Sequence, residues 1–101
     1  MAKTKQTISL IRDVEPEKVF WLCDGRALKN LDELANVLEN IDDNVWNYHV
    51  NAGKNDFANW IENVFGCKSL GSAIRKVKNP KTAAKKIREK IKGSSFWSFA
   101  F

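Results

Sequence analysis

The chain has 101 residues, which is enough for one hydrophobic core and too short for two ordinary domains. Hydrophobic residues make up 44% of the chain, including four tryptophans and six phenylalanines, and this composition argues against intrinsic disorder. The net charge of +5 is unevenly divided, because residues 1–67 carry seven Lys/Arg against eleven Asp/Glu whereas residues 68–101 carry ten against one. A basic block of this kind attracts nucleic-acid phosphates, anionic lipids or acidic proteins.

Several protein classes lack support in the sequence. No stretch approaches the roughly 18 apolar residues of a membrane-spanning helix, and the first residues lack the apolar core of a secretory signal. These features predict a cytoplasmic location. The two cysteines, Cys23 and Cys67, form no CxxC pair, so neither a disulfide framework nor a zinc site is indicated, and we expect no cofactor.

The N-terminal part of the chain is predicted to contain an arm and a hairpin. Residues 1–17 are expected to form a flexible arm, in which residues 7–11 alternate like a short strand. A single domain is predicted over residues 18–93. It begins with a β-hairpin near residues 19–29, because strand-forming residues precede Asp24-Gly25, the dipeptide that a type I′ turn selects. An isolated hairpin is marginal in water, so we expect it to pack on helices.

The rest of the domain shows helical periodicity. Apolar spacing and capping residues predict helices over about residues 31–41, 43–50, 56–65, 70–77 and 80–92. Asn30 is the predicted N-cap of the first, Gly66 the C-terminal glycine of the third, and Asn79-Pro80 the start of the fifth. We therefore predict an α+β fold, predominantly α, with a short N-terminal hairpin packed on four to five helices. Gly93 is expected to end the last helix, and residues 94–101 to form an aromatic tail.

Polar and aromatic residues are dense around the turn before the third predicted helix. The strings FWLCDG (20–25), LDELA (31–35), YHVN (48–51) and KNDFANWI (54–61) together resemble an archaeal domain family of unknown function, over about residues 18–92. The resemblance implies a small, mainly helical intracellular domain and no known activity. It marks five residues as a candidate polar site: His49, Asn51, Asn55, Asp56 and Trp60. Their alternative roles are structural, as a helix cap, a core aromatic and a bridge between helix ends.

Catalysis is not predicted. The single histidine, His49, has no partner at a spacing typical of nucleophilic or metal chemistry, and no small-molecule substrate is expected.

The basic block of the last two predicted helices suits a partner with phosphate groups. Nine residues are candidates for contacting an anionic partner: Arg75, Lys76, Lys78, Lys81, Lys85, Lys86, Arg88, Lys90 and Lys92. The first function hypothesis is therefore non-catalytic binding of an anionic macromolecule, nucleic acid first, and the alternative is a merely solvated helix. The spacing around Gly66 also allows a helix-turn-helix, although Glu62 stands where that motif has a small residue.

The C-terminal aromatic residues support two further hypotheses. Phe96, Trp97, Phe99 and Phe101 would expose more apolar area than a free terminus usually carries. The chain would then be a protein-interaction adaptor or a homodimer that uses this tail. Basic residues followed by aromatic ones also describe a weak anchor on anionic membranes.

Overall fold

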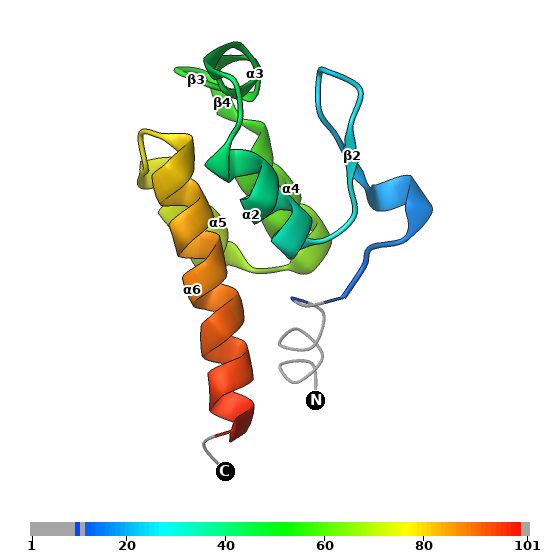
Figure 1. The fold of residues 1–101 in the computed structure, drawn as a ribbon, viewed down its shortest axis with the longest axis vertical. Coiled ribbons are helices and arrows are strands. Elements are labelled where there is room, and N and C mark those ends of the chain that lie inside the picture. The colour runs from blue at the N-terminus through cyan, green and yellow to red at the C-terminus, as the bar shows by residue number, and fades with distance from the viewer. Residues whose placement is uncertain (1–9, 11, 100–101) are drawn as a thin grey trace.

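The computed structural model describes residue 10 and residues 12–99, with side chains described up to residue 93 (Figure 1). This region contains α-helices, one short 3-10 helix and two small antiparallel strand pairs, so the fold is α+β and predominantly α, as predicted. The elements follow the order η1 (Pro16–Lys18), β1 (Phe20–Trp21), β2 (Ala27–Leu28), α2 (Leu31–Glu39), α3 (Asp43–His49), β3 (Val50–Asn51), β4 (Lys54–Asn55), α4 (Asp56–Phe65), α5 (Lys68–Lys76) and α6 (Pro80–Phe99).

Strands β1 and β2 form the predicted hairpin, but its turn differs from the predicted type. The N–H of Gly25 donates to the Leu22 carbonyl at 2.9 Å, and the N–H of Leu22 donates to the Arg26 carbonyl at 2.8 Å. Gly25 has a φ of 100°, whereas Asp24 has no positive φ. A type I′ turn requires positive φ at both central residues, so that prediction is wrong. The loop needs the conformational freedom of glycine only at Gly25.

A second hairpin was not predicted. Strands β3 and β4 pair Val50 with Asn55 and Asn51 with Lys54, around a two-residue loop. The sequence predicts a helix to about residue 50 and no strand between it and the next helix. This hairpin carries the chain from the end of α3 directly into the N-cap of α4, and so places His49 and Asp56 at its two ends.

Asparagine side chains start three of the helices. The Oδ1 atoms of Asn30, Asn55 and Asn79 accept hydrogen bonds from backbone N–H groups three residues further on, at 2.7, 3.0 and 2.8 Å. Gly66 ends α4 with a φ of 68°, as predicted. Helix α5 differs from expectation, because it begins at Lys68, before the predicted residue 70, and its N-cap residue Cys67 makes no side-chain cap bond.

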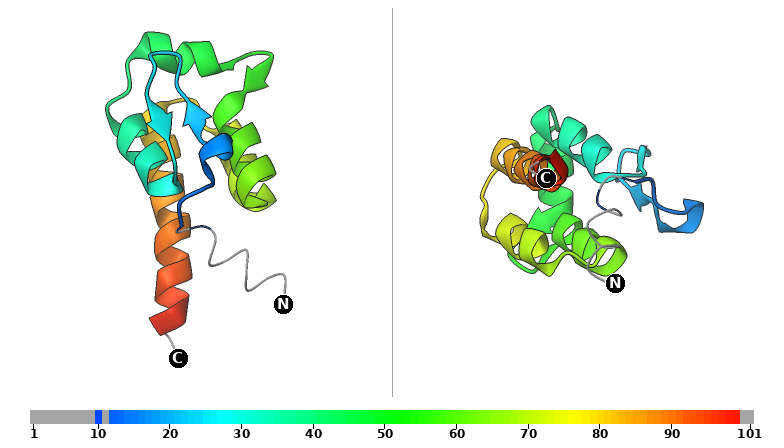
Figure 2. Two further views of the ribbon diagram at one scale, coloured as in Figure 1. Left: turned by 90° about the vertical axis from the view of Figure 1, so that its right-hand side faces the viewer. Right: turned by 90° about the horizontal axis from the view of Figure 1, so that it is seen from below.

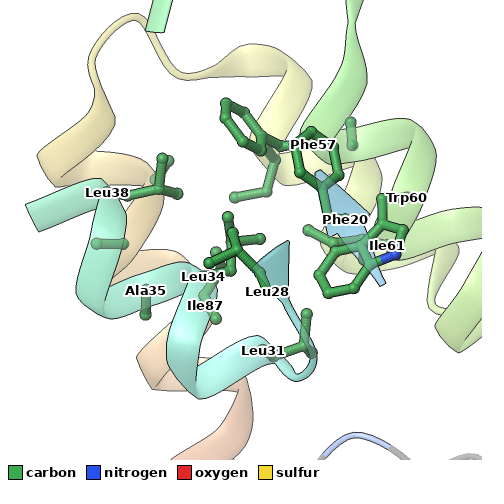
Figure 3. Packing of buried hydrophobic residues seen from close by; sticks show 14 of the residues in the cluster. Phe20, Leu28, Leu31, Leu34, Ala35, Leu38, Phe57, Trp60, Ile61 and Ile87 are labelled. Carbon is green, nitrogen blue, oxygen red and sulfur yellow. The ribbon is translucent and has the colours of Figure 1, made fainter. Parts of the chain in front are cut away.

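The core lies where the hairpin meets the helices (Figure 3). Phe20 of β1 and Leu28 of β2 point into the same cluster as Leu34 of α2, Phe57 of α4 and Ile87 of α6. Helix α6 lies along α2 and also contacts α5, which in turn packs on α4 (Figures 1 and 2). The hairpin therefore packs on helices, as its small size requires.

Described structure extends beyond the predicted limits of the domain, residues 18 and 93, at both ends. Leu10 is buried, and the N–H of Val14 donates to the Lys29 carbonyl at 2.7 Å, so packed residues occur before residue 18. The strand predicted at residues 7–11 lies, apart from Leu10, outside the described residues.

Helix α6 was expected to end at Gly93, but it continues to Phe99. Glycine disfavours a helix interior by only about 1 kcal/mol relative to alanine, which is too little to end a helix by itself. The last turns of α6 project beyond the other helices (Figure 1). Within the described part of the chain, no helix is both long and apolar enough to cross a bilayer.

Candidate functional site

His49 is buried at the junction between the β1–β2 loop and the start of α4. Its side chain is 5% exposed, and its ring packs against Phe20 and Phe57 with centroid distances of 5.1 and 5.2 Å. The N–H of Cys23 donates to His49 Nε2 at 3.1 Å, and His49 Nδ1 lies 2.9 Å from Asp56 Oδ2. One imidazole ring thus links three segments of the chain.

These hydrogen bonds define the tautomer of the neutral ring. Because Nε2 accepts from a backbone amide, the ring hydrogen resides on Nδ1 and is donated to Asp56. Lys54 Nζ donates to the same carboxylate oxygen at 2.9 Å. Partial burial raises the pKa of Asp56, but the hydrogen bonds from His49 and Lys54 outweigh burial and leave that pKa below its ordinary value of 3.8.

This arrangement suits a structural role better than a chemical one. Both ring nitrogens of His49 already have protein partners, so neither is available to a substrate or a metal ion. Within the residues that the structure describes, no three His, Cys, Asp or Glu side chains gather as a metal site requires.

The other residues of the predicted polar site have separate local contacts. Asn55 is 6% exposed and caps α4, while Asn51 Oδ1 accepts from the N–H of Gly53 at 3.1 Å in the β3–β4 turn. Trp60 is a core residue whose Nε1–H donates to the Lys18 carbonyl at 2.8 Å. The structure therefore brings His49 and Asp56 together, with Lys54 and Cys23 as partners that sequence reasoning missed.

Arg75 is bound to α4 and does not extend freely from α5. Its guanidinium donates to the two Glu62 carboxylate oxygens at 3.0 and 3.2 Å and to Asn59 Oδ1 at 2.7 Å. The hydrogen bond from Arg75 lowers the pKa of Glu62. The Glu62 side chain lies against Gly71 of α5. A methyl group on residue 71 would overlap the Glu62 side chain. Arg75, one of the nine residues predicted to contact an anionic partner, is thus engaged within the protein.

Basic residues on the α2 side of α6 are also engaged. Arg88 donates to Glu39 at 2.7 Å and to Asp32 at 3.3 Å, and it contacts Asn36 as well. The first of these bonds lowers the pKa of Glu39. Lys81 Nζ donates to the Glu39 backbone carbonyl at 2.9 Å. Helix α2 therefore neutralises much of the basic charge that the sequence assigns to this side of α6.

Other predicted basic residues remain exposed. Lys76, Lys78, Lys85, Lys86 and Lys92 are exposed, and none forms an ion pair within the described region. Lys90 Nζ lies 3.3 Å from Ser69 Oγ, across a shallow groove of about 290 Å³ between α5 and α6. Sequence reasoning missed Ser69 as a groove residue, although its i, i+4 spacing from Ala73 places both on one side of α5.

The predicted interaction tail is described only as backbone. Phe96, Trp97 and Phe99 belong to the last turns of α6, and their side chains, like the whole of Phe101, lie outside the described residues.

Compared with known protein families, with curated proteins and with solved structures, the chain has no match. The resemblance to an archaeal domain family therefore stays a prediction.

Proposed function

We propose that the protein is a non-catalytic binding module whose α5–α6 surface contacts the phosphate backbone of a nucleic acid. The observation that carries this proposal is a group of exposed lysines on and beside these helices that make no ion pair in the described region, among them Lys76, Lys78, Lys85, Lys86 and Lys92. Each lysine can replace a counterion of a phosphate, which favours association in a sequence-independent way.

The chemistry of the surface favours nucleic acid over a membrane. Every exposed side chain among residues 68–92 is polar or charged. A helix that lies in a membrane interface needs large apolar side chains on one exposed face, in addition to its lysines. A phosphate backbone needs only hydrogen-bond donors and positive charge.

The test is fluorescence anisotropy of a labelled DNA duplex at several salt concentrations between about 50 and 200 mM. If about five lysines each contact one phosphate, log Kd should change with log salt with a slope near 4 to 5. The double variant Lys85→Gln/Lys86→Gln should lower that slope by about 2.

The matched control is Lys18→Gln/Lys29→Gln, which removes the same charge from two exposed residues in the N-terminal part of the domain. Its slope should equal that of the unmodified protein. Absence of binding at about 50 mM salt, or an equal loss of slope in both double variants, would overturn the proposal, because the α5–α6 surface would then have no specific part in binding.

A further inference from the structure

The groove between α5 and α6 brings a serine hydroxyl and two lysines together. Ser69 and Ala73 line its α5 side, Lys86 and Lys90 line its α6 side, and the buried Leu70 contributes to its floor. Lys86 and Lys90 are one helical turn apart, with Cβ atoms about 5–6 Å from each other. Their flexible four-carbon stems allow both ammonium groups to reach one ligand in the groove.

The charge of the groove matches a phosphodiester. Neither Lys86 nor Lys90 has a carboxylate within ion-pair distance in the described part of the chain. Glu89 also lines the groove and offsets one of the two positive charges. The remaining charge of +1 complements the single negative charge of a backbone phosphodiester, and fits less well the nearly doubly charged phosphate at a strand end.

The hydrogen bond between Lys90 and Ser69 leaves a donor for a ligand. Lysine has only donors, so Lys90 supplies the hydrogen of the 3.3 Å contact and Ser69 Oγ accepts it. The hydroxyl hydrogen of Ser69 is then available for a phosphate oxygen. Its other neighbour is Cys67 Sγ at 3.8 Å, which is only a weak acceptor.

From these contacts we infer that the α5–α6 groove binds one internal phosphodiester group of the nucleic-acid backbone, between the ammonium groups of Lys86 and Lys90 and the hydroxyl of Ser69. This inference rests on the proposed function and narrows it, because it assigns one phosphate of the bound strand to a defined place. The other exposed lysines would contact neighbouring phosphates.

The test is an NMR titration of the full-length ¹⁵N-labelled protein with a DNA duplex that lacks terminal phosphates. The groove variant Lys86→Gln/Lys90→Gln is compared with Lys18→Gln/Lys29→Gln, which removes the same charge from two exposed residues outside the α5–α6 surface. In the unmodified protein and in the control, the amide signals of Ser69, Leu70 and Ala73 should shift. In the groove variant these shifts should be lost. Ser69→Ala should weaken binding about fivefold, the effect of one hydrogen bond.

The outcomes separate this inference from the proposed function. The groove site would be overturned if the protein binds DNA without shifts of the Ser69, Leu70 and Ala73 amide signals. The broader proposal would then still stand. A parallel titration with inorganic phosphate identifies the ligand source. Groove shifts with inorganic phosphate but no DNA binding would overturn both the proposed function and the phosphodiester assignment. Unfolding midpoints close to that of the unmodified protein ensure that each variant is folded.

Discussion

Replacing His49 by alanine tests whether the predicted polar site is structural. The substitution removes the acceptor of the Cys23 N–H and the donor to Asp56, and it leaves a space between Phe20 and Phe57. We expect the folded state to lose stability, while the proposed DNA binding by the α5–α6 surface is unchanged under conditions in which the variant is folded.

The magnitude follows from three contributions. The Cys23 amide is only partly buried and regains some water contact, so its lost partner costs about 1 kcal/mol. The link to Asp56 contributes about 1 kcal/mol, because Asp56 is 28% exposed and keeps its contact with Lys54. Loss of the buried ring and of its aromatic contacts costs a further 1 to 2 kcal/mol. The total is about 3 to 4 kcal/mol, a large part of the 5–15 kcal/mol typical of a domain.

Urea denaturation followed by circular dichroism measures this change. With an m value of about 1.3 kcal/mol/M, the unfolding midpoint should fall by about 2 to 3 M. A double-mutant cycle with Asp56→Asn isolates the His49–Asp56 contribution. A loss below about 1 kcal/mol would refute the structural role of the ring. A loss of DNA affinity by a folded His49→Ala protein would instead place His49 in the binding site.

Three other predictions can be checked by the same unfolding experiment. Gly25→Ala should lower the free energy of unfolding by about 1 to 2 kcal/mol, because a φ of 100° strains any residue with a Cβ. The control Gly53→Ala should lower it much less, since the added Cβ would meet only Asn51 Oδ1 at 3.7 Å. Equal losses in the two variants would contradict this prediction. Asn55→Ala should cost about 1 to 2 kcal/mol, because α4 loses its side-chain cap, and an unchanged midpoint would rule that cap out as a stabilising contact. Asp56→Asn should be less stable than the unmodified protein at pH 7, and this difference in stability should shrink as the pH falls below 3.8. The reason is that folding lowers the pKa of Asp56. The resulting stability is present above the ordinary pKa of 3.8 and is lost as the pH falls through the folded-state pKa. A stability difference that does not shrink in acid would exclude this linkage.

Four helix ends were predictable from the sequence because the interactions that define them are local. The caps formed by Asn30, Asn55 and Asn79 each reach three residues along the chain, and Gly66 needs only its own backbone conformation. Such contacts can be inferred from spacing alone.

The state of the basic residues was not predictable in this way. Arg75 binds Glu62 across 13 residues, and Arg88 binds Glu39 across 49 residues. Only the packing of α5 on α4 and of α6 on α2 creates these pairs. Read from the sequence, both arginines count as free positive charge, and so the predicted basic surface was broader than the exposed one. The Cys23 amide escaped prediction as a partner of His49 for the same reason, since it lies 26 residues away.

The attachment of the β1–β2 hairpin has a consequence for the order in which the domain assembles and opens. The Cys23 amide reaches His49 across 26 residues, and the Lys18 carbonyl reaches Trp60 across 42 residues. Contacts of such long range close large loops of chain, so we expect them to form only after α3 and α4 are in place. In a hydrogen-exchange experiment the Cys23 amide should then exchange sooner than the amides in the middle of α4. The loop that carries Cys23 would thus leave His49 and return many times during the lifetime of one folded core.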